Sequence, residues 1–297
     1  MAMTNTINKI ITASIILLLG ACNTTDENPK SVEVKNGILP IAYTKSGKGD
    51  TAIVFVHGWG INKEYWKNQV DAFDKRFTVI TLDIGGHGAS GHERNSWKIE
   101  DFSNDVMAVI DSLNLNKVIL VGHSMGGDII LDVAYKIPDR IVGFIGIDNF
   151  KEVGVPLSPE QHVQVDEFMK ALNGNYKETV SGYSKAALFP PNYADSISVN
   201  RVVNDIANTD SVVAAKSLSG MFEFAPKEIA LLEEMQKPVH LIVSDFTPML
   251  QDSLAKYSKA GFGIKTMHGV GHYPMIEKPE EFNKLLLETL DEIAKGK

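Results

Sequence analysis

The chain of 297 residues carries a formal net charge of −8, and 44% of its residues are hydrophobic. This length suits one large α/β domain with an insertion, or two small domains. An acidic chain without basic blocks argues against nucleic acid as a partner, and the composition is ordinary for a globular protein.

The N-terminal residues have the pattern of an export signal. Lys9 precedes an apolar run at 10–20, which is too short to span a bilayer but fits the hydrophobic region of a signal peptide. The segment Leu19-Gly20-Ala21-Cys22 resembles a bacterial lipobox, whose cysteine is lipidated and becomes the new N-terminus. We therefore expect a lipoprotein signal peptide at 1–21, a lipid on Cys22 and a polar, flexible tether at 22–35.

The lipobox resemblance implies a protein that is anchored to a membrane through lipid and does not span it. Cys22 is the only cysteine in the chain, which fits export to an oxidising compartment without disulfides. Asn23 follows it, where Asp is the usual inner-membrane retention mark in enteric bacteria. The resemblance therefore favours the outer membrane of a bacterial cell envelope, with the folded domain outside the cytoplasm. A plain cleaved signal peptide with an incidental cysteine is the alternative.

Strands and helices alternate in the first half of the chain. Short apolar runs bounded by turn residues predict strands, and apolar residues on one helical face predict amphipathic helices. This alternation indicates a mostly parallel sheet with helices on both faces. The predicted strands are 32–41, 41–44, 52–56, 77–82, 117–121 and 140–147, and the predicted helices are 66–73, 99–113 and 125–137.

From Asn149 to about Gln236 no buried strand is predicted, and helical patterns dominate. The predicted helices there are 159–172, 176–188, 198–205, 211–222 and 226–235. Alternation then resumes with strands at 239–243 and 263–267 and helices at 251–260 and 280–294. We interpret 149–236 as a helical cap, inserted into a core formed by 36–148 and 237–297.

The strand predicted at 117–121 runs into the pattern Gly-x-Ser-x-Gly, here Gly122-His123-Ser124-Met125-Gly126. In a strand-to-helix setting, this pattern marks a strained turn that exposes a serine above a sheet. The two glycines leave room for the strand and the helix to approach each other. The five residues alone are a weak signal, and their setting strengthens it.

Two more glycine-rich segments follow predicted strands: His57-Gly58-Trp59-Gly60 and Gly269-Val270-Gly271-His272. Together with the serine motif they closely resemble the α/β-hydrolase family, in the branch with a single helical cap. The resemblance covers about 36–150 and 237–297. It implies an eight-stranded, mostly parallel sheet flanked by helices, with a serine nucleophile.

The resemblance also implies roles for individual residues. Ser124 would be the nucleophile, and His272 the base that such a poor nucleophile requires. The backbone N–H groups of Trp59 and Met125 would form the oxyanion hole. No dinucleotide fingerprint or metal-ligand cluster occurs, so we expect neither a cofactor nor a metal.

The acidic residue is where the sequence departs from the family. The family's aspartate usually follows the strand predicted here at 239–243, where this chain has the neutral Thr247. Two carboxylates keep the chain order serine, acid, histidine. Asp148 ends the preceding strand, where some family members carry their acid, and its offset from Arg140 favours it. Asp245 is the alternative acid, two residues before the usual position.

The leading hypothesis is a serine hydrolase that acts on a small-molecule ester, thioester or lactone of small to medium size and partly apolar character. Hydrolysis of a carbon–carbon bond and acyl transfer use the same residues and stay open. A hypothesis of another class is a ligand-binding lipoprotein that keeps the fold without turnover, for which Thr247 is the best support. The sequence indicates no oligomeric state.

Overall fold

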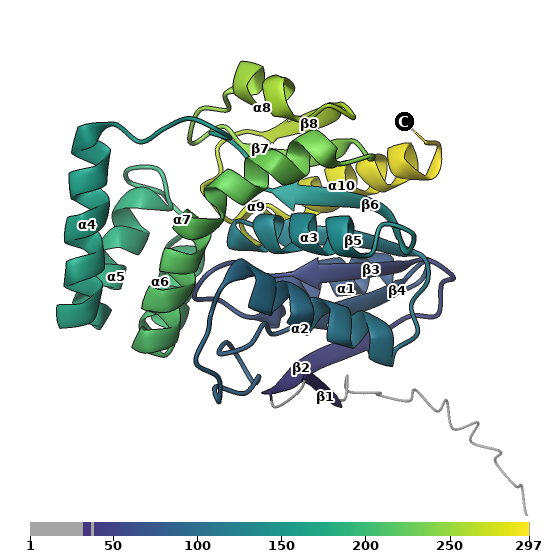
Figure 1. Cartoon of the computed structure of the whole chain (residues 1–297), viewed down its shortest axis with the longest axis horizontal. Coiled ribbons are helices and arrows are strands. Elements are labelled where there is room, and N and C mark those ends of the chain that lie inside the picture. Colours follow the sequence, from purple (N-terminus) through teal and green to yellow (C-terminus); the bar gives the residue numbers. More distant parts are fainter. Residues whose placement is uncertain (1–31, 37–38, 297) are drawn as a thin grey trace, which may run out of the picture.

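The computed structural model describes residues 32–36 and 39–296, and the predicted signal peptide and Cys22 lie outside them. The strands are β1 (Val32–Asn36), β2 (Leu39–Ser46), β3 (Ala52–Val56), β4 (Thr78–Leu82), β5 (Val118–His123), β6 (Ile141–Ile147), β7 (Val239–Ser244) and β8 (Phe262–Met267). Within the described residues they form one eight-stranded sheet, in the order β1-β2-β4-β3-β5-β6-β7-β8 (Figure 1). Only the β1–β2 and β2–β4 pairs of this sheet are antiparallel, so the predicted fold class is confirmed.

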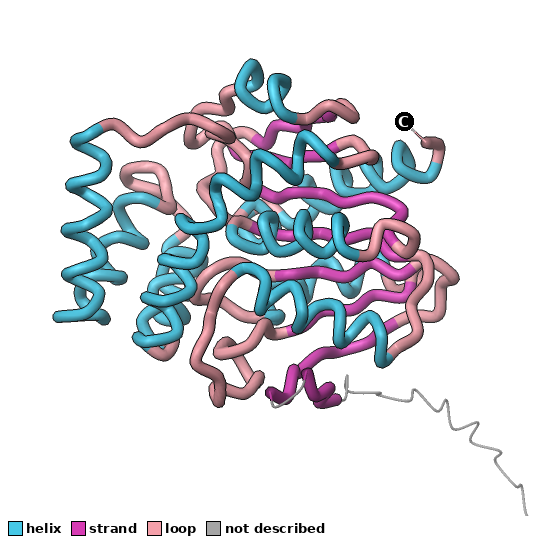
Figure 2. The backbone as a smooth tube through the Cα atoms, in the orientation of Figure 1, coloured by secondary structure: helices cyan, strands magenta, loops and turns pink. Residues whose placement is uncertain are grey.

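Helices cover both faces of the sheet (Figure 2). Besides a 3₁₀ helix at Lys63–Trp66, they are α1 (Lys67–Phe73), α2 (Ile99–Ser112), α3 (Met125–Lys136), α4 (Pro159–Gly174), α5 (Tyr176–Ala187), α6 (Ser196–Asn208), α7 (Ser211–Glu234), α8 (Gln251–Tyr257), α9 (Pro274–Glu277) and α10 (Pro279–Ala294). Among residues 32–36 and 39–296, no helix combines the length and the apolarity needed to cross a bilayer.

The central strands are buried from both sides, because α2 and α3 cover one face while α1 and α10 cover the other. All five residues of β3 are buried. Val54 and Val56 pack into the core beneath α2 and α3, whereas Ile53 and Phe55 pack into the opposite core with Phe282 of α10. Successive side chains of a strand point to opposite faces, so each strand contributes to both cores.

The helices that follow β6 cover the loops at the carboxyl ends of the strands. Two hydrogen bonds join this region to the loop after β3: Thr209 Oγ1 donates to Gly60 O at 3.1 Å, and Trp59 Nε1 donates to Ala214 O at 2.8 Å. A third joins it to the loop after β8, because Leu188 O accepts from the backbone N–H of His272 at 2.9 Å. The helical region therefore helps to position two loops of the core.

The prediction of separate helices at 211–222 and 226–235 was wrong, because α7 runs through both with Pro226 in its interior. Proline has no N–H and usually ends a helix, since it forfeits one intrahelical hydrogen bond. Tertiary packing offsets that loss here. Leu231 and Leu232 are 4% and 0% exposed, in the core beneath α2 and α3. Figure 1 shows α7 running towards β7 along α3.

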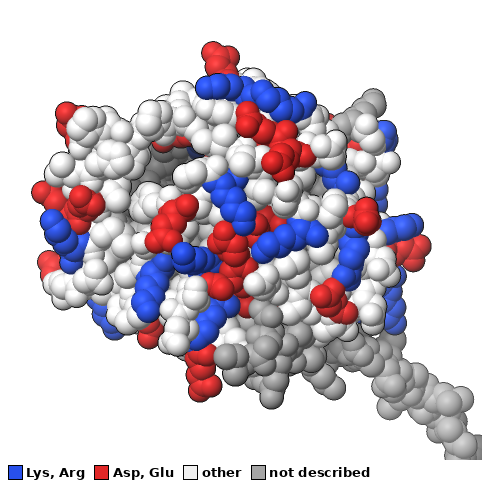
Figure 3. Space-filling view, in the orientation of Figure 1, with Lys and Arg blue, Asp and Glu red and all other residues white. Residues whose placement is uncertain are grey.

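Ion pairs join this second half of α7 to the core. Lys227 Nζ lies 2.9 Å from Glu100 Oε1 on α2 and 2.9 Å from Asp132 Oδ1 on α3. Asp132 also pairs with Lys136 at 2.6 Å. Figure 3 shows acidic and basic side chains gathered at the centre of this face, over α3 and α7. The network ties the helical region to the sheet layer beneath it.

A second contact between α3 and α7 joins two acids. Asp128 and Glu228 share a side-chain hydrogen bond, and Asn149 Nδ2 lies 3.4 Å from Asp128 Oδ1. Burial raises the pKa of both carboxyls, and the charge of Asp128 raises the pKa of Glu228 further. Two carboxyl groups in contact are rarely ionised together, because their negative charges repel. The Asp128–Glu228 pair therefore keeps a proton that the same groups would release in the unfolded chain.

This pair predicts a pH-dependent stability. Glu228→Gln keeps a hydrogen-bond donor towards Asp128 but is neutral at every pH. Because the folded wild type binds the extra proton, its stability falls as the pH rises above 4.5, the ordinary pKa of glutamate. We expect the variant to exceed wild type by about 1–2 kcal/mol in free energy of unfolding at pH 8, and by almost nothing at pH 4. Urea denaturation measures both values.

Asp132→Asn is the matched control on the same helix, with the opposite sign. Burial favours the neutral form of Asp132, but Lys136 and Lys227 outweigh it and hold its pKa below the ordinary 3.8. Its stabilisation is therefore present at neutral pH and lost in acid, so this variant should be less stable than wild type at pH 8 and close to it in acid. Identical pH profiles for wild type and Glu228→Gln would contradict the shared proton.

Candidate active site

The segments that carry the predicted site residues follow strands that are neighbours in the sheet. The strand β5 lies between β3 and β6, and β7 and β8 follow on the same side. Because these strands are parallel, their carboxyl ends meet at one edge, which is where ligands bind in open α/β sheets. Trp59, Ser124, Asp148 and His272 all lie in segments that follow these carboxyl ends.

Ser124 occupies a strained turn between β5 and α3. Its backbone has φ 52 and ψ −123, a positive φ that residues with side chains rarely adopt. Three hydrogen bonds hold the turn: Ser124 N–H donates to Ile147 O at 3.0 Å, and Ser124 O accepts from Gly127 N and Asn149 Nδ2, both at 2.7 Å. The surrounding structure therefore fixes the strained conformation.

The two glycines of the motif allow β5 and α3 to approach closely. A Cβ atom on Gly122 would lie 2.2 Å from the backbone oxygen of Gly126. A Cβ atom on Gly126 would lie 2.6 Å from the backbone oxygen of Val56, on β3. Because both neighbours are backbone atoms of the sheet and helix, a side chain at either position would push α3 away from the sheet.

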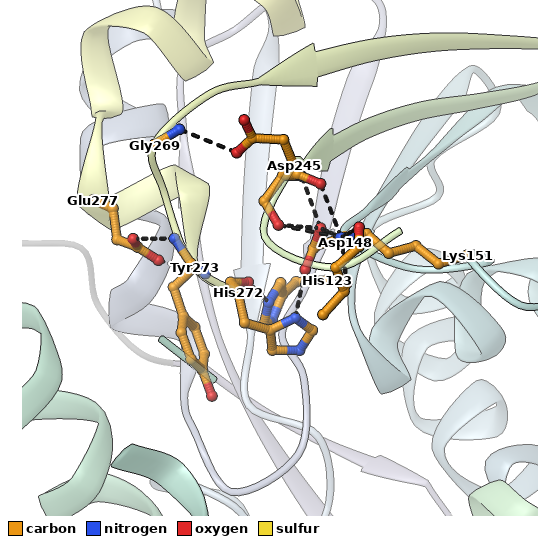
Figure 4. A network of polar contacts seen from close by, with 11 residues as sticks. His123, Asp148, Lys151, Asp245, Gly269, His272, Tyr273 and Glu277 are labelled. Atoms are coloured by element: carbon orange, nitrogen blue, oxygen red, sulfur yellow. Dashed lines mark hydrogen bonds and ion pairs between the residues drawn. The ribbon is translucent and has the colours of Figure 1, made fainter. Parts of the chain in front are cut away.

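His272 and Asp148 are in direct contact. His272 Nδ1 donates to Asp148 Oδ2 at 2.6 Å, and Figure 4 shows the two side chains facing each other. A hydrogen bond at Nδ1 fixes the imidazole orientation and leaves Nε2 as the nitrogen for proton transfer. The loop around His272 is held by Glu277, which accepts from the N–H groups of Gly271 at 2.5 Å and Tyr273 at 2.7 Å.

Asp148 is buried, with its side chain 3% exposed, and both of its oxygens have partners. Oδ1 accepts from the backbone N–H of Ser244 at 2.8 Å and from the Ser244 hydroxyl at 2.9 Å. Burial alone would raise the pKa of Asp148. The hydrogen bond and charge of His272, with the charge of Lys151, outweigh burial and hold that pKa well below its ordinary value. Asp148 is therefore a fixed negative charge behind the imidazole.

Asp245, the other candidate acid, has different partners. Its Oδ2 lies 2.8 Å from His268 Nδ1, and its Oδ1 accepts from the backbone N–H of Gly269 at 3.1 Å. Figure 4 shows its carboxylate directed towards Gly269. Of the two carboxylates that the sequence left open, Asp148 therefore meets His272, and Asp245 pairs with a more exposed histidine.

The sequence interpretation did not identify Lys151 or Asn149 as part of this site. Lys151 Nζ lies 2.7 Å from Asp148 Oδ1 and 2.8 Å from Thr247 Oγ1. Asn149 holds the carbonyl oxygen of Ser124. The sequence signal for Lys151 was its place three residues after the candidate acid. Its contact to Thr247 joins residues 96 positions apart, which a local pattern does not show.

The two predicted oxyanion donors lie on either side of the serine turn. Met125 begins α3, so its N–H has no intrahelical partner and lies at the positive end of the helix dipole. Trp59 follows Gly58, where a Cβ atom would lie 3.1 Å from Ser124 Cβ. Among the described residues the Trp59 N–H has no backbone hydrogen bond. These two N–H groups are the ones that the resemblance implies for an oxyanion hole.

The remaining histidines near the site are buried and structural. His57 uses both ring nitrogens within its own region: Nδ1 donates to Gly58 O at 2.8 Å, and Nε2 accepts from the N–H of Ile84 at 3.1 Å. His123 Nε2 donates to the carbonyl oxygen of His272 at 2.7 Å. Burial lowers the pKa of His123 to about 3, so it is neutral at physiological pH. Within the described part of the chain, no cluster of His, Cys, Asp or Glu suits a metal ion.

Comparison with known proteins identifies the fold family. Residues 51–199 match the family model of the alpha/beta hydrolase fold. The chain is 25% identical to the dihydrolipoyllysine-residue acetyltransferase component of the acetoin cleaving system of Cupriavidus necator, over 85% of this chain and 67% of that protein. A thermophilic esterase from Thermogutta terrifontis superposes with a TM-score of 0.77 at 22% identity, covering 89% of this chain and 99% of the esterase. The enol-lactonase from Burkholderia xenovorans gives 0.75 at 20% identity, covering 88% and 100%. Since the family model spans half of its length, the chain belongs to the α/β-hydrolase fold family.

Proposed function

We propose that the protein is a serine hydrolase that cleaves a carboxylic ester, thioester or lactone through an acyl-enzyme intermediate. The observation that carries the proposal is the 2.6 Å hydrogen bond between His272 Nδ1 and Asp148 Oδ2, in a chain of the α/β-hydrolase fold family. The strained backbone of Ser124 supports its assignment as the nucleophile, because such strain concentrates at functional sites.

In the proposed mechanism, Ser124 Oγ attacks the substrate carbonyl carbon while His272 Nε2 accepts the hydroxyl proton. The N–H groups of Trp59 and Met125 stabilise the negative charge on the carbonyl oxygen. The imidazolium then donates its proton to the leaving group, and an acyl-enzyme remains. Water, deprotonated by His272, then attacks the carbonyl carbon of the acyl-enzyme, and the imidazolium returns the proton to Ser124 Oγ as the bond to the acyl group breaks and the acid is released. Asp148 holds the imidazole orientation and stabilises the imidazolium throughout.

Aromatic side chains beside Trp59 favour the proposal that the substrate is partly apolar. Tyr183 on α5 lies between Trp59 and Phe168, with ring centroids 6.5 Å and 4.8 Å away. It is 37% exposed, yet desolvation raises the pKa of its phenol. Part of the Tyr183 ring is thus accessible to solvent beside Trp59. Figure 3 shows the surface hollowed between α7 and the connection from β6 to α4.

The names of the structural neighbours, an esterase and an enol-lactonase, support the ester or lactone class. The alternative of a ligand-binding protein without turnover depended on the neutral Thr247. That support weakens because Asp148 provides His272 with a carboxylate from the preceding strand.

Ser124→Ala tests the nucleophile. On a panel of esters and lactones of graded acyl length, we expect kcat/KM to fall by at least about 10³-fold, because the covalent route is removed. A fluorophosphonate probe should label wild type at Ser124 and leave the variant unlabelled. Ser112→Ala, on the α2 surface, is the matched control and should behave as wild type. Folded wild type that neither hydrolyses the panel nor reacts with the probe would overturn the proposed function.

Two asparagine variants test the acid. Asp148→Asn should lower kcat by about 10²–10⁴-fold, because an amide cannot stabilise the imidazolium and favours the wrong tautomer. Asp245→Asn should stay within about threefold of wild type, because its partner is His268. Thermal denaturation checks that each variant is folded. The reverse order of losses would assign the acid to Asp245, and two small losses would refute both candidates.

We also propose that Cys22 is lipidated after cleavage of residues 1–21, and that the domain is tethered to the outer membrane of a bacterial envelope. In a Gram-negative host, wild type should incorporate a labelled fatty acid and sediment with outer membranes, whereas Cys22→Ser should lose both properties. Asn23→Asp should move the protein to the inner membrane. Wild type that is processed but unlabelled would leave the plain signal peptide as the explanation.

A further inference from the structure

Lys151 fills the space between Asp148 and the turn that follows β7. Its ammonium lies 2.7 Å from Asp148 Oδ1, 2.8 Å from Thr247 Oγ1 and 2.9 Å from Ser244 O. An ammonium has three N–H donors, and each has an acceptor here. The side chain is 10% exposed. Lys151 is therefore an immobilised cation and not a solvated surface lysine.

The backbone of Lys151 is fixed as well. Its carbonyl oxygen accepts from the N–H of Leu250 at 2.9 Å. The connection after β6 and the segment after β7 are thus joined by main-chain and side-chain contacts, although they lie more than 90 positions apart. These contacts determine where Ser244 and Thr247 stand relative to Asp148.

The carboxylate of Asp148 is shared between two partners. Oδ1 faces Lys151, and Oδ2 faces His272 (Figure 4). With Oδ1 held by Lys151 and Ser244, the carboxyl group cannot rotate away without breaking three contacts. The positive charge of Lys151 also offsets part of the negative charge of Asp148, which would otherwise stabilise a protonated His272 more strongly.

We propose that Lys151 is a positioning residue of the site, which orients Asp148 Oδ2 towards His272. Through its charge, Lys151 also lowers the pH at which the His272 imidazole loses its proton. The inference rests on the proposed function for its catalytic meaning. Apart from catalysis, one buried cation sets both the geometry and the protonation of the Asp148–His272 pair.

The other groups around His272 do not duplicate this cation. They are His123 from β5, which is neutral at physiological pH; Tyr273, whose pKa burial raises well above the ordinary value; and the acid Glu277 from α9. The Asp245–His268 pair joins the turn after β7 to the start of the loop that carries His272. Each of these groups is neutral or acidic or already paired, so Lys151 is the cation in contact with Asp148.

The test compares the pH dependence of kcat/KM for three variants. Lys151→Met removes the charge at similar length, Lys151→Arg keeps it, and Lys265→Met removes a matched lysine from an ion pair on β8. Without the cation the imidazolium is favoured, so the acid limb for Lys151→Met should move about 0.5–1 pH unit upward. We also expect kcat to fall about tenfold because Asp148 is less firmly held. Lys151→Arg and Lys265→Met should keep the midpoint of wild type.

A folded Lys151→Met with the wild-type midpoint would overturn the inference, because a merely structural lysine changes stability without moving the acid limb. If Lys151→Met does not fold, Lys151→Gln replaces it. If wild type hydrolyses no substrate, the proposed function fails, and NMR titration of His272 decides the inference separately. An upward shift of that titration in Lys151→Met supports it, and an unchanged titration overturns it.

Discussion

One buried carboxylate joins the parts of this site. Asp148 contacts Ser244 at the end of β7, His272 after β8 and Lys151 in the connection to the helical region. A buried charge is stable only when its oxygens are hydrogen-bonded or paired, and here every such partner comes from a different segment. The burial of Asp148 therefore holds three segments in register, and the geometry of His272 depends on all of them.

The residues around Asp148 extend this control to the nucleophile. Ile147 and Asn149, its two neighbours, hold the backbone N–H and C=O groups of Ser124. The end of β6 and the residue after Asp148 thus hold the serine turn through the main chain of Ile147 and the side-chain amide of Asn149, and Asp148 holds the imidazole through its carboxylate. The strain at Ser124 persists because β6 lies beside β5 and supplies these hydrogen bonds.

The helical region contacts the elements that carry the site residues. The second half of α7 is fastened to α3, the helix that Ser124 precedes, by Lys227 and by the Asp128–Glu228 pair. Its first half accepts a hydrogen bond from the Trp59 indole through Ala214. One contact of α7 with the core therefore involves the side chain of Trp59, and the other is made to α3, the helix that begins with Met125.

By itself, the sequence determined the sheet-and-helix class and the strained serine turn, because apolar periodicity and the sterics of Gly122 and Gly126 act over a few residues. It misjudged α7 at Pro226, where packing of distant residues outweighs a local break. Only the tertiary structure decided which carboxylate meets His272 and that Lys151 and Asn149 belong to the site. Asp148 and Asp245 follow adjacent parallel strands, so their order in the chain does not separate them. The difference comes from the turns after each strand. Asp148 meets His272, 124 positions away, and Lys151 beside it contacts Thr247, 96 positions away, whereas Asp245 meets His268, only 23 positions away.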